Sequence, residues 1–217
     1  MRIRRTTSCL ALLLALALPL ACTNPFKPAT PEGSTGGGVP EDFSSPESVL
    51  ATMQRAINSK PLGAQAWLHA FADSTVASDR AYRGWYDGPV KLAWQLATSA
   101  TAPEPWGVKE ELRLPSWIYQ LRQNADYDFQ WEPDVSQQDG TQVVDTVWFH
   151  RKYTLRANSS GVGEIIAQGT CDLSFQEARG RYSIYRWTDR YYPDVTVDVD
   201  TQRKRSMSWL RLDSLIR

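Results

Sequence analysis

Apolar and polar residues alternate most clearly in two segments late in the chain, residues 164–176 and 181–189. In the first segment, apolar or small residues occupy every second position: Ile165, Ala167, Gly169, Cys171, Leu173 and Phe175. Successive side chains of a strand point to opposite faces, so this spacing predicts a strand with one dry face. Gly180 lies in the short connection between the segments, where it permits the positive φ of a tight hairpin.

Two earlier segments alternate in the same way. Residues 126–132 place on one side Tyr127, Phe129 and Trp131. Residues 143–156 do the same with Val147, Phe149, Tyr153 and Leu155. Turn signals separate the segments, at Asp139-Gly140 and over residues 158–161. Four consecutive strands joined by short turns predict an antiparallel meander.

The first half of the chain shows helical spacing instead. A serine cap at Ser45 and a proline at Pro46 begin a helix, whose expected buried face is Val49, Leu50, Met53, Ala56 and Ile57. Further helices are expected over residues 64–72, 90–97 and 106–123. Helices followed by strands predict an α+β fold, in which N-terminal helices pack on a curved antiparallel sheet of four to six strands.

The last part of the chain is more polar. Val195, Val197 and Val199 alternate with acidic residues, which favours a solvated extended segment over a calcium loop, because the glycine and bidentate glutamate of such a loop are missing. A short helix is expected to use Met207, Leu210 and Leu215. The basic run at residues 203–205 precedes it and is interpreted as part of a solvated tail rather than a contact with anionic headgroups.

The N-terminal residues are typical of an export signal. Three arginines precede an apolar run over residues 10–20, which is too short for a comfortable membrane span, and Ala21 lies directly before Cys22. Residues 23–45 are rich in Pro, Gly, Ser and Thr, which predicts a flexible tether. The sequence thus predicts four parts: a signal peptide (1–21), Cys22 with its tether (22–45), a folded domain (46–200) and a basic C-terminal tail with a short helix (201–217).

The residues around the predicted cleavage site, Leu18-Pro19-Leu20-Ala21-Cys22, resemble the lipobox of bacterial lipoproteins. The resemblance implies cleavage before Cys22, which then carries a diacylglycerol thioether and an N-acyl chain such as palmitate. Pro19 departs from the usual aliphatic residue, and ordinary cleavage to a soluble periplasmic protein is the alternative. Thr23, rather than Asp, follows the cysteine, which resembles outer-membrane sorting. The implied location is the bacterial cell envelope, with the lipid in the outer membrane and the domain facing the periplasm.

Charge and cysteine content narrow the possibilities. Removing residues 1–21 takes three arginines from the 24 basic residues and leaves 21 against 24 acidic ones, which argues against nucleic acid as a partner. Cys9 leaves with the signal and Cys22 is the expected lipid attachment site, so Cys171 has no disulfide partner and is expected to be a small core residue.

Three short motifs carry a second resemblance: Ser45-Pro46-Glu47, Trp106 followed by Glu110-Glu111, and Trp187-Thr188-Asp189. Together with the element order, they resemble bacterial lipoproteins of the nuclear transport factor 2-like superfamily. The resemblance covers about residues 45–192 and the terminal segment 206–217. It implies the cone-shaped, cystatin-like fold shared by ketosteroid isomerase and SnoaL-like cyclases.

A curved sheet closed by helices favours a cavity for an apolar ligand. The candidate ligand-binding residues are Tyr127, Trp131, Trp148 and Trp187; the alternative is that the aromatic rings simply fill the interior. No catalytic residue, metal site or cofactor is predicted. The best candidates for acid–base chemistry are His150 with Asp172 or Asp189, which the strand pattern allows to meet across the sheet.

The sequence therefore predicts a membrane-anchored lipoprotein whose domain is a non-catalytic binding module. Its expected ligand is a small apolar molecule or an envelope protein, and nucleic acid is not expected. The alternative is an isomerase- or cyclase-like enzyme acting on a small apolar substrate in the same cavity.

Overall fold

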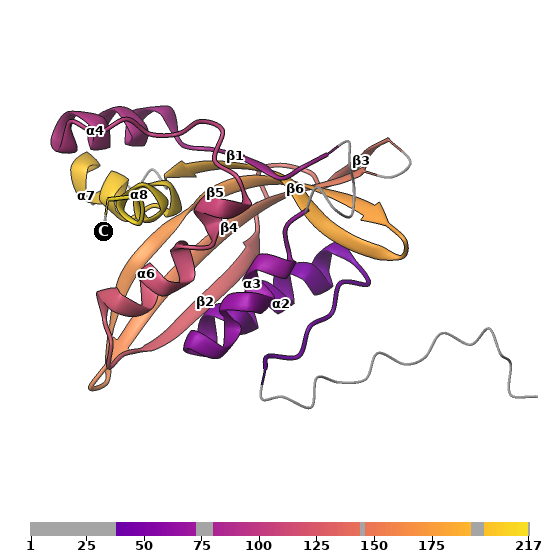
Figure 1. Ribbon diagram of the computed structural model, residues 1–217, viewed down its shortest axis with the longest axis horizontal. Helices are drawn as coiled ribbons and strands as arrows, with labels where there is room; N and C mark the ends of the chain where they lie inside the picture. Colours follow the sequence, from indigo (N-terminus) through magenta and orange to yellow (C-terminus); the bar gives the residue numbers. More distant parts are fainter. Residues whose placement is uncertain (1–37, 73–79, 144–145, 192–197, 217) are drawn as a thin grey trace, which may run out of the picture. The chain divides into compact units, whose positions relative to one another are not determined.

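The computed structural model describes residues 38–72, 80–143, 146–191 and 198–216. Within these residues six strands form one sheet (Figure 1). They are β1 (Arg83–Trp85), β2 (Asp126–Pro133), β3 (Gly140–Val143), β4 (Thr146–Ser159), β5 (Val162–Ala178) and β6 (Arg181–Tyr191). The strand order is β1-β6-β5-β4-β2, and β3 also pairs with β4.

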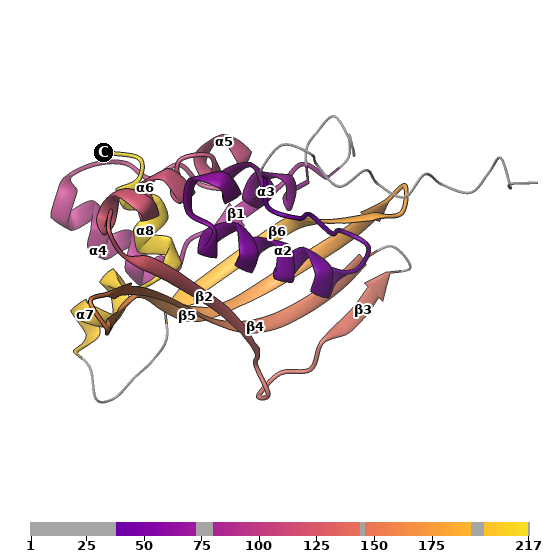
Figure 2. The same ribbon diagram turned by 90° about the horizontal axis from the view of Figure 1, so that it is seen from below.

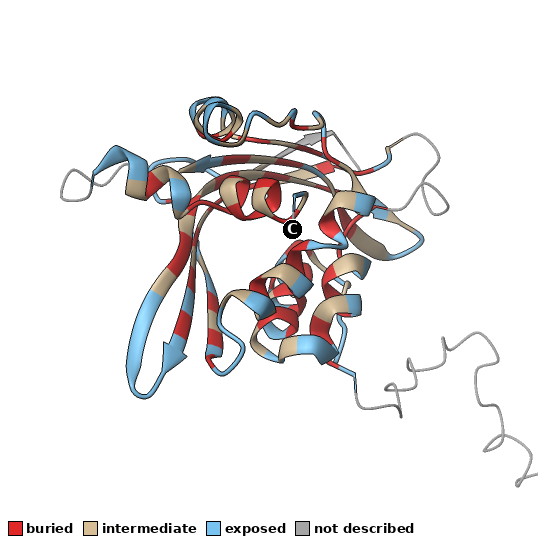
Figure 3. Cartoon of the chain, turned by 60° about the vertical axis from the view of Figure 1, so that its left-hand side comes forward, coloured by how far each residue is buried: buried red, intermediate tan, exposed pale blue. Residues whose placement is uncertain are grey.

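The helices lie mainly on one face of this sheet (Figure 2). They are α2 (Pro46–Asn58), the 3₁₀ turn η2 (Lys60–Gly63), α3 (Ala64–His69), α4 (Gly88–Thr98), α5 (Val108–Glu111), α6 (Leu114–Leu121), α7 (Val199–Lys204) and α8 (Met207–Asp213). Buried positions gather between the sheet and the helices (Figure 3). The predicted α+β class, with helices on a curved sheet, is confirmed.

The long hairpins follow the sequence pattern. Ser160 and Gly161 have φ values of 52° and 83° between β4 and β5, and Arg179 and Gly180 have values of 57° and 76° between β5 and β6. Two successive positive φ values give a turn whose twist matches that of the flanking strands. The predicted dry face of β5 is buried, including Ala167, Cys171, Leu173 and Phe175.

Two details of the sheet differ from the prediction. The sheet is mixed rather than antiparallel, because β1 joins the edge of β6 in parallel. The predicted hairpin at Asp139-Gly140 is wrong, since β2 and β3 both pair with β4 and so run along it in the same direction. The Asp139 carboxylate instead holds the neighbouring strand, by accepting from the backbone N–H of His150 at 2.9 Å and from Arg151 Nη1 at 2.8 Å.

The first helix begins as predicted. The N–H of Ser48 donates to Ser45 Oγ at 3.1 Å, which satisfies one of the free donors at the start of α2. The predicted inner face, from Val49 to Ile57, is buried. After η2, helix α3 buries Trp67 completely.

The helix predicted over residues 106–123 is divided in the structure. Residues 106–123 form two helices, with Pro115 in the first turn of the second one. Leu112 lies between them and is 56% exposed, so its predicted place on the apolar side is wrong. Helix α4 is present with Trp94 buried, as expected.

The C-terminal helix is part of the folded domain rather than of a separate tail. Helix α8 buries Met207 and Leu210, as predicted, and also Leu212, in the same core as the sheet. The basic residues 203–205 before it are partly or fully exposed. Val199 begins helix α7 rather than ending a strand, because Asp198 caps that helix by accepting from the N–H of Thr201 at 2.9 Å. The other two valines of the expected strand lie outside the described residues, as does the predicted segment 75–77.

The folded unit also begins earlier than the predicted boundary at residue 45. Val39 is 8% exposed in the core. The carbonyl of Phe43 accepts from the N–H of Tyr182 at 2.8 Å, and the Arg181 guanidinium lies 4.0 Å from the Phe43 ring centre. In the part of the chain that the structure describes, no helix has the length and apolar character needed to cross a bilayer.

Candidate functional site

A fully buried carboxylate, Glu111, lies at the end of α5. Three neutral donors from separate segments converge on it: Trp67 Nε1 at 3.2 Å, the Tyr82 hydroxyl at 2.7 Å and Trp106 Nε1 at 2.7 Å. Trp106 Nε1 also lies 2.9 Å from the Tyr82 oxygen. A buried carboxylate is costly without such partners, so these donors offset part of the cost of burying Glu111.

Helix α8 supplies the counter-charge. Arg211 is 2% exposed; its Nε donates to Glu111 Oε1 at 2.7 Å, and its Nη2 lies 2.7 Å from the same oxygen as an ion pair. The guanidinium carbon lies 4.1 Å from the Trp187 ring centre and 4.5 Å from that of Trp106. We call these six residues the interior cluster: Trp67, Tyr82, Trp106, Glu111, Trp187 and Arg211.

The electrostatics of the interior cluster shift the pKa values of Arg211 and Tyr82. Burial alone lowers the pKa of Arg211, but Glu111, Tyr82 and Asp189 together more than offset this and raise the pKa above its ordinary value. Burial, and then the negative charge of Glu111, hold the pKa of the Tyr82 hydroxyl well above its usual range. Arg211 therefore stays charged and Tyr82 stays neutral around neutral pH.

A second buried carboxylate, Asp189 on β6, depends on the same helix. Its Oδ1 accepts from the Tyr153 hydroxyl at 2.8 Å, and its Oδ2 accepts from the N–H and the hydroxyl of Ser208, both at 2.6 Å. The Tyr153 oxygen in turn accepts from the N–H of Met207 at 2.9 Å. Burial raises the pKa of Asp189, and it also raises the pKa of Tyr153 strongly. Helix α8 thus provides partners for both buried acids.

Gly169 leaves the space that this second arrangement needs. A side chain at this position of β5 would collide with the Tyr153 hydroxyl and with the carbonyl oxygen of Arg190. The missing Cβ therefore lets the Tyr153 hydroxyl approach the strand and reach Asp189.

The residues predicted to line an apolar cavity make contacts with the protein itself. Trp187 is fully buried, and its ring centre lies 5.7 Å from that of Trp131. Trp131 Nε1 donates to the carbonyl of Leu50 at 3.1 Å, and the Tyr127 hydroxyl donates to the carbonyl of Ile118. These rings therefore contribute to the packed interior.

Trp148 lies apart from the other three predicted residues. It is half-buried on the face of β4 opposite the buried Phe149, and its indole covers Gly140 of the neighbouring strand. The structure therefore does not bring the four candidate ligand-binding residues together.

The predicted acid–base pair forms on the outer face of the sheet. His150 Nδ1 lies 2.6 Å from Asp172 Oδ1, and Arg190 Nη2 donates to Asp172 Oδ2 at 2.6 Å. The prediction that His150 could instead pair with Asp189 is wrong, because Asp189 lies on the buried face of the sheet, opposite Cys171. We call His150, Asp172 and Arg190 the outer cluster; their side chains are 19%, 31% and 50% exposed.

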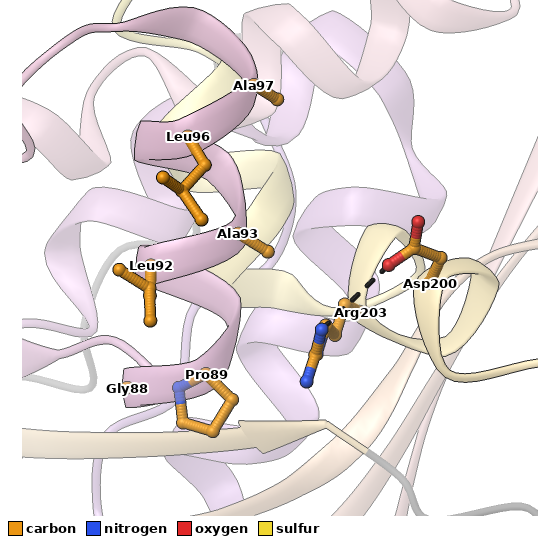
Figure 4. Close-up of a pocket in the computed structure, with 8 residues that line it drawn as sticks. All are labelled: Gly88, Pro89, Leu92, Ala93, Leu96, Ala97, Asp200 and Arg203. Carbon is orange, nitrogen blue, oxygen red and sulfur yellow. Dashed lines mark ion pairs between the residues drawn. The ribbon is translucent and has the colours of Figure 1, made fainter.

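A groove of about 780 Å³ lies on the surface between α4 and α7 (Figure 4). It is lined by Gly88, Pro89, Leu92, Ala93, Leu96, Ala97, Asp200 and Arg203. It shares no residue with the interior cluster. This surface was not predicted from the sequence, although the helical spacing of Leu92 and Leu96 indicates a second apolar side of the helix.

Cys171 is a buried free cysteine, and burial raises the pKa of its thiol well above the ordinary value. Over the described residues, no group of three or more His, Cys, Asp or Glu side chains is arranged to hold a metal ion.

Comparison with solved structures supports the fold. Rv3472, a function-unknown protein from Mycobacterium tuberculosis, is 11% identical with a TM-score of 0.50, and the match covers 77% of this chain and 89% of that one. An NTF2-like protein with a cystatin-like fold from Novosphingobium aromaticivorans is 10% identical with a TM-score of 0.46, covering 86% and 90%. No family model and no curated protein sequence matches the chain. The likeness is thus one of fold.

Proposed function

We propose that this chain is a lipid-anchored, non-catalytic binding module of the bacterial envelope, with a protein as its partner. The observation that carries the proposal is the Glu111–Arg211 pair. It fills the region between the sheet and the helices with the protein's own charges and indole rings. A domain of this kind offers its surface, rather than its interior, for recognition.

An enzyme of the isomerase or cyclase type fits this geometry less well. Such chemistry needs a carboxylate that reaches a substrate and a neutral donor for the developing oxyanion. Glu111 and Asp189 are instead bonded to residues of the same chain, and α8 supplies partners for both. The outer cluster contains an acid–base pair, but it lies on a sheet face open to water.

A small apolar ligand in the interior is the other alternative, and native mass spectrometry of the purified mature protein tests it. We expect the mass of the acylated chain alone. A co-purifying apolar molecule of defined mass would overturn the proposed closed interior. The Cys22→Ala variant is the matched control, because lipid carried by the anchor disappears from it while a ligand in the interior remains.

The proposed anchor is Cys22, with the N-terminal pattern of charge, apolar run and small residue as its support. The expected location is the outer membrane, because Thr23 follows the cysteine. Several acyl chains on one residue hold a protein at a bilayer far better than one chain does. We expect Cys22→Ala to move the protein from the membrane fraction to the soluble fraction; continued sedimentation with membranes would contradict the anchor.

A further inference from the structure

Helix α4 has two apolar faces. Val90 and Trp94 are buried against the core, at 0% and 1% exposure. Leu92 and Leu96, one helical turn apart, are 59% and 77% exposed on another side of the same helix. Two leucines exposed together on one short helix, beside a groove, are typical of a surface that meets an apolar phase.

Among the described residues, the charges around this face are mainly compensated, except at one end. Lys91 of α4 is paired with Glu104, and Arg203 lies 3.8 Å from Asp200, three residues earlier on the same wall of the groove (Figure 4). Lys204 follows Arg203 at the end of α7 and is exposed, and Arg205 comes next. The two acids of this segment lie at its opposite end: Asp198 caps the helix and Asp200 is in its first turn. The C-terminal end of α7 is therefore positive.

We propose that the exposed face of α4 and the basic end of α7 together rest on an anionic phospholipid surface. Leucines enter the boundary between headgroups and acyl chains, while lysine and arginine attract anionic headgroups. This inference rests on the lipid anchor of the proposed function, and it gives the anchored domain a fixed side toward the membrane.

The length of the proposed tether makes such a contact effective. About 16 residues separate Cys22 from the buried Val39, and a flexible segment of that length has an r.m.s. span of roughly 20–24 Å. A domain held so close to the bilayer meets it at a high effective concentration, so a weak contact is sufficient. Leu92, Leu96 and one or two basic residues supply a contact of that strength.

A fluorescent label reports this contact in the anchored protein. Cys22 is acylated under the proposed function and Cys171 is buried, so a thiol-reactive, polarity-sensitive dye attaches to Leu96→Cys alone. The matched control is Val162→Cys on the β4–β5 hairpin, where the native side chain is 72% exposed. In vesicles containing phosphatidylglycerol, we expect a blue shift of the emission at position 96 and none at position 162.

A second set of variants separates this surface from the anchor. In Cys22→Ser with Leu96→Cys and Cys9→Ser, added phosphatidylglycerol vesicles are expected to give the same blue shift at higher lipid concentration, and pure phosphatidylcholine a weaker one. Adding Leu92→Ser to this variant is expected to weaken vesicle binding by about tenfold. Loss of the anchor alone would leave these results unchanged, so the two proposals fail separately.

Three outcomes would overturn the membrane-facing surface. The first is no shift at position 96 in either the anchored or the Cys22→Ser protein. The second is an equal shift at positions 96 and 162. The third is a shift that depends on protein concentration without vesicles, which would assign the face to a second copy of the chain.

Discussion

The interior cluster and the outer cluster each place a basic side chain against a carboxylate at nearly the same distance. Arg211 and Glu111 are 2.7 Å apart, and His150 and Asp172 are 2.6 Å apart. The two pairs differ in their exposure to water. The side chains of the inner pair are 2% and 0% exposed, and those of the outer pair are 19% and 31% exposed.

This difference decides what each cluster does. Removing one partner of a buried pair leaves an uncompensated charge in a medium that solvates it poorly, so the pair is structurally indispensable even where it adds little net stability. A pair at the surface exchanges its contacts with water at small cost. The distances alone would not have distinguished the two clusters in their importance for stability.

The largest expected effect comes from splitting the inner pair. Glu111→Gln leaves Arg211 buried without its carboxylate, and we expect it to lower the free energy of unfolding by about 3–5 kcal/mol. The measurement is urea denaturation at neutral pH. The double variant Glu111→Gln with Arg211→Met removes both charges and keeps an oxygen at position 111 for the neighbouring donors, so we expect it to be more stable than Glu111→Gln. A loss below about 1 kcal/mol in Glu111→Gln would mean that the Glu111–Arg211 pair behaves like a surface ion pair, which would contradict the difference between the two clusters.

Trp187→Ala tests whether the rings around Arg211 are core. The residue is fully buried and lies against the guanidinium. We expect a loss of at least ~3 kcal/mol in the free energy of unfolding, as for other aromatic truncations in cores. Trp148→Ala is the matched control on the outer face, with a smaller expected loss. Equal losses in the two variants would mean that the faces do not differ as described.

The second buried acid sharpens the comparison through pH. Burial raises the pKa of Asp189 above the ordinary 3.8, so the folded protein holds this proton more tightly than the unfolded chain does. The contribution of such a group to stability is present below its unfolded pKa and is lost as pH rises through its folded pKa. We therefore expect the stability of the wild type relative to Asp189→Asn to fall as pH rises above 3.8.

Asp134 provides a control of opposite sign for this experiment. A hydrogen bond from the Ser136 side chain lowers the pKa of Asp134, so its contribution is present above the unfolded pKa and lost as pH falls. The stability of the wild type relative to Asp134→Asn should therefore rise with pH over the same range. The same trend in both variants would contradict the assignment of Asp189.

The smallest effect is expected in the outer cluster. A double-mutant cycle of His150→Ala and Asp172→Asn should give a coupling energy below about 1 kcal/mol, because water solvates both groups. Urea denaturation of the four proteins measures it. A coupling of several kcal/mol would show that water does not solvate the outer pair, and would favour a catalytic role for His150 and Asp172.

The sheet was predictable because its information is local. Alternation along β5 and the positive-φ glycine of its hairpin each lie within a few residues, so the strand, its buried face and its turn could all be read from the sequence. The mixed character of the sheet could not, because β1 is a three-residue strand without a periodic pattern.

The interior cluster could not be predicted from one sequence. Glu111 and Arg211 are 100 positions apart, and nothing in the local sequence of either shows that they pair. The short helix at residues 207–213 and its apolar positions were expected, but the burial of Arg211 was not, because a charged residue after three basic ones is typical of a solvated surface. His150 and Asp172 were easier to connect, since strand register alone brings them to adjacent positions.

The position of Arg211 along the chain also sets an order of events. Synthesis delivers Glu111 about 100 residues before the arginine that neutralises it. Until α8 emerges, the nascent domain has two acids without their final partners and indole rings without a cation between them. Its core therefore closes only after α8 has been made, so the last helix of the chain completes the charge balance of an interior that the earlier segments began.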